Sequence, residues 1–244
     1  MRRLPPLLAA SLLLLTAACS EDAGSVRRVQ LAVSVVGVVP SDGLQTPSGW
    51  EVSLAAAELS VAAVYFRNAR NDGGTADEQG RVVAQVLGPF SIDALDPEPQ
   101  RLDLQVSAVT ERALSAELWL TEAQDGPVAD ALGPFLALAH VAGTARRDGQ
   151  EVAFEGGLQF PEGSEQSGYQ TWSNRRIRRL ACDFLPSADG ELQIRVDPSH
   201  FLDAVQFDSL SERDGARGFV TPAEQLQLRN GIALTSAYDF ELNP

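Results

Sequence analysis

The chain contains two histidines, His140 and His200, and these are the side chains best suited to bind a transition metal. A neutral imidazole is the commonest protein ligand for such metals. A complete site needs three or four ligands, and Met1 is the only methionine. Two interpretations stay open: a copper site formed by His140 and His200, or two histidines held in the fold. The apolar neighbours of His140 favour the second.

An oxygen-rich segment, "RNARNDGGTADEQG" (67–80), is the second candidate for metal binding. Calcium takes six to eight oxygen ligands, and polar loops between β-strands supply them. The spacing does not match the EF-hand pattern, and a solvated turn is the favoured alternative. If calcium binds, its ligands come from Asn68, Asn71, Asp72, Asp77 and Glu78.

The one basic cluster of the chain follows two aromatic residues. Its members are Tyr169, Trp172, Arg175, Arg176, Arg178 and Arg179. Guanidinium groups beside aromatic rings bind anionic glycans or partner proteins. The favoured alternative is that the arginines pair with carboxylates on neighbouring strands. This cluster is nevertheless the first choice for a binding surface.

Signals for catalysis are weak. No G-x-S-x-G motif and no glycine-rich phosphate loop before a helix is present, and the absence of lysine excludes Schiff-base chemistry. With 33 acidic residues, any fold brings some carboxylates together, so a carboxylate pair for glycoside hydrolysis has no specific signature. The sequence favours a non-catalytic binding or structural role. A metal-binding protein is the alternative, and a glycan-active enzyme ranks third.

The charge balance limits the ligands. The chain has 19 basic and 33 acidic residues, a formal net charge of −14. Nucleic-acid binding needs clustered positive charge over a large surface, so this class of partner is disfavoured. A hydrophobic content of 44% is ordinary for a globular chain with a real core.

The N-terminus has the pattern of an export signal. Arg2 and Arg3 precede an apolar run that ends in "LLLLTAACSED" (12–22). The run is too short to span a bilayer, and small residues follow it. "LTAAC" resembles the lipobox of bacterial lipoproteins, although Thr16 stands where that family usually has leucine. Ordinary signal cleavage nearby is the alternative.

The lipobox resemblance implies that Cys19 is acylated and becomes the first residue of the mature chain. Several acyl chains, palmitate among them, then give a lasting membrane anchor. Ser20 follows Cys19 and favours the outer membrane within the cell envelope, facing the periplasm or the surface. The predicted organisation is a signal peptide (1–18), a tether (19–25) and one β domain (26–244). Cys182 is then unpaired, and it is predicted to be buried.

Alternation of apolar and polar residues predicts strands through most of the mature chain. The segments are 30–35, 50–54, 59–66, 81–88, 102–107, 114–120, 136–145, 151–160, 192–197 and 238–242. Asp148 and Gly149 predict a tight hairpin between two of them. The predicted fold is all-β: an antiparallel, jelly-roll-like β-sandwich of about ten strands.

One or two short helices are expected near the C-terminus. Thr221, Pro222 and Glu224 form an N-cap signature, and Asp197 with Pro198 predicts a second helical turn. The segments "GWEVSLAAAELSVAAVYF" and "LQIRVDPSHFLDAVQFD" are similar to those of uncharacterised lipoproteins from GC-rich Gram-negative bacteria. That resemblance implies an exported, β-rich domain and no catalytic residues.

Overall fold

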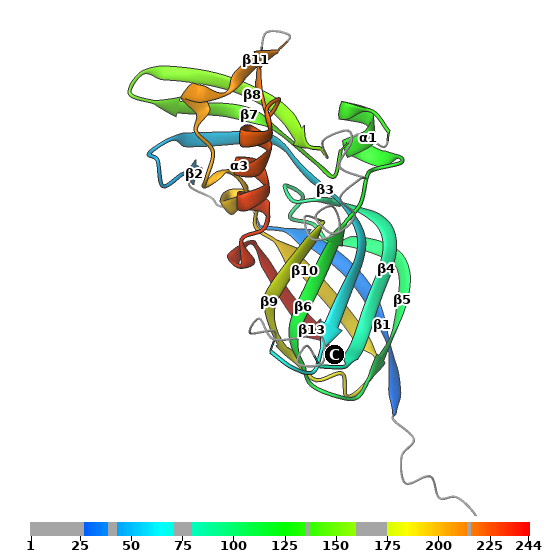
Figure 1. The fold of residues 1–244 in the computed structure, drawn as a ribbon. Helices are drawn as coiled ribbons and strands as arrows, with labels where there is room; N and C mark the ends of the chain where they lie inside the picture. The colour runs from blue at the N-terminus through cyan, green and yellow to red at the C-terminus, as the bar shows by residue number, and fades with distance from the viewer. Residues whose placement is uncertain (1–26, 39–42, 71–79, 135–136, 160–174, 214–215) are drawn as a thin grey trace, which may run out of the picture.

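The protein is described by a computed structural model that covers residues 27–38, 43–70, 80–134, 137–159, 175–213 and 216–244. Strands dominate it (Figure 1). The strands are β1 (Arg28–Gly37), β2 (Leu44–Gln45), β3 (Glu51–Arg67), β4 (Val82–Asp93), β5 (Gln100–Val109), β6 (Ala113–Leu120), β7 (Ala139–Arg147), β8 (Gln150–Leu158), β9 (Arg176–Phe184), β10 (Gly190–Val196), β11 (Ser211–Arg213), β12 (Ala216–Gly218) and β13 (Tyr238–Asn243). The helical segments are α1 (Gly126–Leu132), η3 (Pro198–Leu202), η4 (Phe207–Ser209), α3 (Pro222–Ile232) and η5 (Thr235–Ala237).

The strands form two sheets. One has the order β13-β10-β1-β5, and the other has the order β11-β12-β8-β7-β3-β6-β9, with β2 and β4 also paired to β3. The ladders are antiparallel except for β1–β10 and the short β12–β8 contact. The predicted all-β fold is therefore confirmed, and the two parallel pairs are an addition to it.

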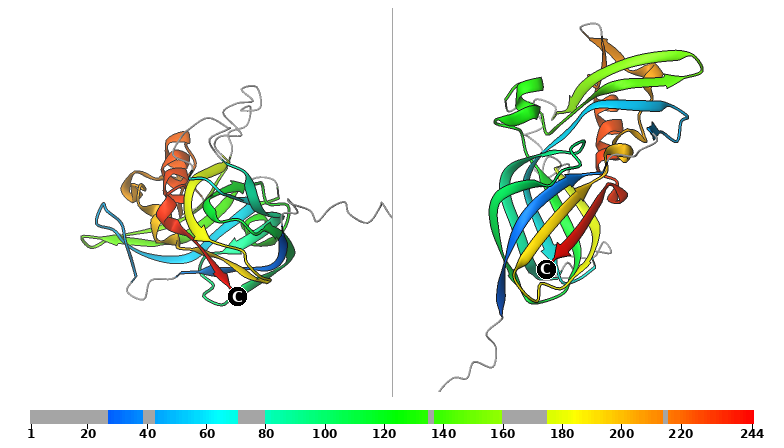
Figure 2. Two further views of the ribbon diagram at one scale, coloured as in Figure 1. Left: turned by 90° about the horizontal axis from the view of Figure 1, so that it is seen from below. Right: turned by 180° about the vertical axis from the view of Figure 1, so that it is seen from behind.

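Strand β3 connects the two parts of the molecule. Its first half pairs with β7, and its second half lies between β4 and β6. Register shifts at Leu54/Ala56 and Val61/Ala63 interrupt these ladders, and such bulges bend a strand and increase its twist. In Figure 2 (right), β1, β10 and β13 lie across the second half of β3 with its neighbours, and both layers curl around a shared core.

The core follows from the alternation of side chains. Val64 and Phe66 on β3 and Leu118 on β6 are fully buried between the sheets. Phe66 packs edge-on against Phe184 of β9 and Phe240 of β13, with ring centroids 5.3 and 5.2 Å apart. Because one face of β3, β6 and β9 is committed to this core, the alternate side chains of the same strands must lie on the outer face.

The predicted helix near the C-terminus is confirmed as α3. Thr221 and Glu224 form a complete capping box, and Pro222 occupies the first turn. The turn predicted after Asp197 is the 3-10 helix η3, in which the Asp197 carboxylate accepts from the Ser199 amide. The predicted Asp148–Gly149 turn joins β7 to β8, with φ of 52° and 79°.

Helix α1 was not predicted from the sequence. Asp125 and Gly126 suggest a turn, and they instead precede a seven-residue helix with Pro127 in its first turn. Its buried residues Val128 and Ala129 pack with Ala123 and Ala137 in a small apolar cluster separate from the main core. This packing stabilises a helix that is too short to be stable by itself.

Candidate functional site

The outer face of β3, β6 and β9 carries polar and aromatic side chains in the middle of otherwise apolar strands. We name the set Tyr65, Arg67, Glu117, Trp119, Arg176 and Arg178 the arginine face. Strand register places these residues in cross-strand rows. One row runs Leu87–Ala63–Trp119–Arg176 from β4 to β9, and the next runs Gln85–Tyr65–Glu117.

Glu117 lies at the centre of this face. Its side chain is only 4% exposed, and three guanidinium groups surround the carboxylate. The Nε of Arg178 lies 3.4 Å from Oε1, the Nε of Arg176 lies 3.7 Å from Oε1, and Nη2 of Arg67 lies 3.8 Å from Oε2. A buried carboxylate needs such charge partners to remain ionised.

These contacts are ion pairs without close hydrogen bonds. Among the described residues, Oε1 of Glu117 and the Nε atoms of Arg67 and Arg176 are buried and have no hydrogen-bond partner. Buried polar atoms are normally hydrogen-bonded, and each exception calls for an explanation. Three guanidinium groups that share one carboxylate retain donors for a further acceptor.

A β-bulge positions the arginines. Ala116 pairs with Leu180 and Leu118 pairs with Ile177, so Arg178 and Arg179 both lie opposite Glu117. Arg179 has a φ of 65°, a conformation that is uncommon for residues other than glycine. The extra residue sets Arg178 and Arg179 next to each other at this point of β9, and Arg178 is the one that pairs with Glu117.

Two aromatic rings adjoin the arginines. The guanidinium of Arg176 lies 3.8 Å from the centroid of the Trp119 ring, and Tyr65 meets Trp119 edge-on with centroids 5.6 Å apart. Both contacts have favourable geometry for a cation or a ring edge against an aromatic face. Further along the same rows, Leu87 is 50% exposed and Gln85 is also exposed. Along the row that starts at Leu87, the outer face thus changes from apolar at β4 to cationic at β9.

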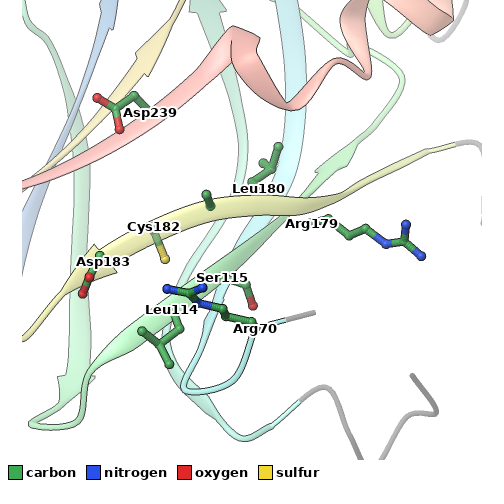
Figure 3. A pocket seen from close by; sticks show the side chains of 9 residues that line it. Arg70, Leu114, Ser115, Arg179, Leu180, Cys182, Asp183 and Asp239 are labelled. Carbon is green, nitrogen blue, oxygen red and sulfur yellow. The ribbon is translucent and has the colours of Figure 1, made fainter. Parts of the chain in front are cut away.

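A pocket of about 710 Å³ adjoins the arginine face. It is lined by Arg70, Leu114, Ser115, Arg179, Leu180, Ala181, Cys182, Asp183 and Asp239. Figure 3 shows Arg70 close to Ser115, Leu114 and the Cys182 thiol, whereas Arg179 points away along β9. Arg112 pairs with Asp183 through two hydrogen bonds at the edge of this pocket. Beyond Arg178, two arginines (Arg70 and Arg179) and two carboxylates (Asp183 and Asp239) thus line the pocket.

Cys182 is buried and unpaired, as the sequence predicts. Burial raises the pKa of its thiol to about 12, and the neighbouring Asp183 carboxylate acts in the same direction. At neutral pH the side chain is therefore a neutral thiol, which is a poor nucleophile.

The structure places the arginines of the predicted basic cluster in different surroundings. Arg176 and Arg178 belong to the arginine face, and Arg179 lines the pocket. Arg175 instead forms an ion pair with Glu122, with Nη1 3.1 Å from Oε2. Tyr169 and Trp172 lie outside the described residues.

Sequence reasoning missed the contribution of β3 and β6. Tyr65, Arg67, Glu117 and Trp119 alternate with apolar residues and look like ordinary solvent-facing positions of a strand. A charged residue between Ala116 and Leu118 is the one signal that could have drawn attention to Glu117. Its burial and its partners depend on pairing with β9, which is far away in the sequence.

The two histidines have different partners. His140 is buried; its Nδ1 lies 3.0 Å from Oε2 of Glu58, and its Nε2 lies 3.5 Å from Oε1 of Glu155. His200 is partly exposed, and its Nδ1 lies 2.9 Å from Oδ2 of Asp203. Within the described ranges, no group of three or more histidine, cysteine, aspartate or glutamate side chains is arranged to hold a metal ion.

The predicted calcium loop is mostly outside the described residues, since Asn71, Asp72, Asp77 and Glu78 fall in 71–79. Asn68 is described: its Nδ2 donates to Glu111, and its Oδ1 accepts from the Arg81 amide. These bonds join the two ends of the segment. They occupy the Asn68 side chain in a structural role.

Comparison of the chain with protein-family models, with curated proteins and with solved structures gives no match. Among the described helices, none is long and apolar enough to cross a membrane. Cys19 and the rest of the predicted signal and tether lie outside the described residues.

Proposed function

We propose that the protein is a non-catalytic, lipid-anchored protein of the cell envelope that binds an anionic ligand on the arginine face. The observation that carries the proposal is the arrangement around Glu117, where three guanidinium groups share one buried carboxylate. An arginine presents donors in a planar fork that matches the oxygens of a carboxylate, sulfate or phosphate. The side chains of Arg176 and Arg178 are 26% and 44% exposed, so part of each is accessible to such a group.

The charge of the whole chain supports a local, selective site. A net charge of −14 repels anions over most of the surface, so a general affinity for polyanions is not expected. Cationic side chains are nevertheless concentrated on β9 and its neighbours, where Arg67, Arg176, Arg178 and Arg179 lie within one outer face and its pocket. If this acidic chain binds an anion, we therefore expect the anion to bind at these arginines.

The anchoring part of the proposal depends on the lipobox-like "LTAAC" and on the polar residues that follow Cys19. Strand β1 begins at Arg28, nine residues after Cys19. In Figure 2 (right), the start of β1 and the C-terminus lie at the same end of the molecule. A membrane anchor at this end leaves the outer face of β3, β6 and β9 accessible from the side.

The experiment measures the affinity of the chain carrying Cys19→Ala for three polyanions at low salt: polyglutamate, oligogalacturonate and dextran sulfate. We expect at least one to bind, and Arg178→Ala to weaken that binding about tenfold, the loss of one charge-assisted contact. Arg146→Ala is the matched control, because Arg146 is 63% exposed and pairs with Glu151 on the β7–β8 hairpin, another part of the chain. Absence of binding to all three, or an equal loss with Arg146→Ala, contradicts the proposal.

A further inference from the structure

We infer that the ligand of the arginine face is an acidic glycan, that is, a chain of sugars that bear carboxylate or sulfate groups. The inference rests on the proposed function and adds the chemical class of the ligand. The observation that supports it is the apolar and aromatic surface beside the arginines, formed by Leu87 on β4, Tyr65 on β3 and Trp119 on β6. A ligand that offered only negative charge would not need this surface.

The outer face is amphipathic along its rows. In the first row, Leu87 and Ala63 lead to Trp119 and then to Arg176. Leu87 is 50% exposed, so its side chain adds apolar surface to this row. Tyr65 and Trp119 are partly exposed and meet edge-on. The first row ends in Arg176, and the second ends in Glu117, which pairs with Arg178.

A sugar ring has the matching chemistry. Its C–H groups form an apolar face that packs against an aromatic ring, while its hydroxyl and acidic groups lie at the rim. A ring placed on Tyr65 and Leu87 directs an acidic substituent toward β9. There, Arg176 and Arg178 supply the charged donors. The exposed amide of Gln85, beside Tyr65, is suited to a hydroxyl group.

The dimensions favour an oligosaccharide. The row from Leu87 to Arg176 spans four neighbouring strands, and three interstrand spacings of about 4.8 Å make it about 14 Å long. This distance exceeds one sugar ring. The pocket beyond Arg178 is lined by Asp239 and by Asp183, which pairs with Arg112, as well as by Arg70 and Arg179. These two arginines are the groups that would meet a further acidic residue of the same chain.

Other anions use only half of this surface. An acidic peptide or inorganic polyphosphate can pair with Arg176 and Arg178, but neither has an apolar ring face for Tyr65 and Leu87. A nucleic acid has stacking bases, yet its closely spaced phosphates meet a chain of net charge −14. Tyr65 and Leu87 therefore favour an acidic glycan over an acidic peptide or polyphosphate.

The test compares oligogalacturonate with polyglutamate of the same number of carboxylates, using the chain with Cys19→Ala. We expect oligogalacturonate to bind about tenfold more tightly. Tyr65→Leu should weaken the binding of oligogalacturonate by about tenfold and that of polyglutamate by less than twofold, whereas Tyr65→Phe, which retains the ring, should leave both unchanged. Dextran sulfate in the same series shows whether sulfate replaces carboxylate.

The outcomes separate the two claims. Equal affinity for oligogalacturonate and polyglutamate, with both weakened by Arg178→Ala and neither by Tyr65→Leu, overturns the glycan assignment and leaves the anion-binding surface intact. Affinity for none of the polyanions overturns the proposed function itself. Circular dichroism of each variant, with an unfolding midpoint equal to that of the parent chain, shows that a loss of affinity is not a loss of fold.

Discussion

Arg178 lies opposite Glu117 across the β6–β9 ladder, with its Nε 3.4 Å from Oε1 of the carboxylate. The relationship depends on the bulge in β9, which places both Arg178 and Arg179 opposite a single residue of β6. A regular ladder would set one residue against Glu117. The bulge thus concentrates positive charge beside a carboxylate that is almost completely buried.

Replacing Glu117 with glutamine should destabilise the fold. The variant leaves three guanidinium groups close together without a counter-charge, and we expect a loss of roughly 1–3 kcal/mol in the free energy of unfolding. Urea denaturation measures it. Added sulfate should restore part of the loss, because the anion takes the place of the carboxylate between the arginines.

Glu151→Gln is the control for Glu117→Gln. Glu151 is 61% exposed and pairs with Arg146, so its replacement should change stability by less than about 0.5 kcal/mol. If Glu117→Gln is as stable as the parent chain and sulfate has no effect, the carboxylate does not organise the arginines.

Glu224 should make the stability of the C-terminal part depend on pH. Burial alone would raise the pKa of its carboxyl, but hydrogen bonds from Thr221 and Ser211 outweigh burial and hold that pKa below its ordinary value. The stabilisation is therefore complete above the unfolded pKa of about 4.3 and is lost as the pH falls through the folded pKa. Glu224→Gln should cost about 1 kcal/mol at pH 7 and progressively less below pH ~4.

Unfolding in urea at pH 7 and at pH 3 measures this difference. Glu98→Gln serves as the comparison, since Glu98 is exposed in the turn between β4 and β5. A cost for Glu224→Gln that stays constant from pH 7 to pH 3 is incompatible with the capping role.

Cys182 should be inert toward thiol reagents in the folded protein. With a pKa of about 12, roughly one thiol in ten thousand is ionised at pH 8, and burial further limits access. In the chain with Cys19→Ala, we expect iodoacetamide to modify Cys182 within minutes in 8 M urea (about the concentration that unfolds most small proteins) and over many hours without urea. Rapid modification of the folded chain would show that the thiol is exposed.

Cys19 should carry the membrane anchor. Expression in a Gram-negative host with labelled palmitate should give a labelled protein in the membrane fraction, and Cys19→Ala should abolish both the label and the membrane association. Cys182→Ala, which removes the other cysteine, should retain both. Absence of label on the parent chain returns the N-terminus to an ordinary cleaved signal.

The fold was accessible to sequence reasoning because its main signals are local. Alternation along β3, β6 and β10 and the hairpin at Asp148–Gly149 each depend on a few neighbouring residues. The capping box of Thr221 and Glu224 is equally local. The parallel pairing of β1 with β10 is not, because their Cα partners, such as Leu31 and Gly190, are separated by most of the chain.

Only part of the candidate site could be predicted from the sequence, because the rest depends on contacts between distant strands. The run of arginines on β9 is visible in the sequence, whereas its relation to Glu117 depends on the β6–β9 register and on a bulge. Tyr65 and Arg67 join the site because β3 pairs with β6 on one side and β4 on the other. Side-chain alternation predicts that these residues face outward, but it does not predict which residues of other strands lie beside them.

The most direct test of the account is an NMR titration that observes the tryptophan indole N–H signals of the full chain with Cys19→Ala. The chain has three tryptophans, and Trp119→Phe assigns the signal of interest. Trp50 is completely buried in another part of the molecule, next to Phe207, and serves as the internal reference. We predict that oligogalacturonate shifts the Trp119 signal in a saturable manner and leaves the Trp50 signal in place. In Arg178→Ala, the same shift should need about tenfold more ligand. An unchanged Trp119 signal at saturating ligand would contradict the central claim that the arginine face is the binding site.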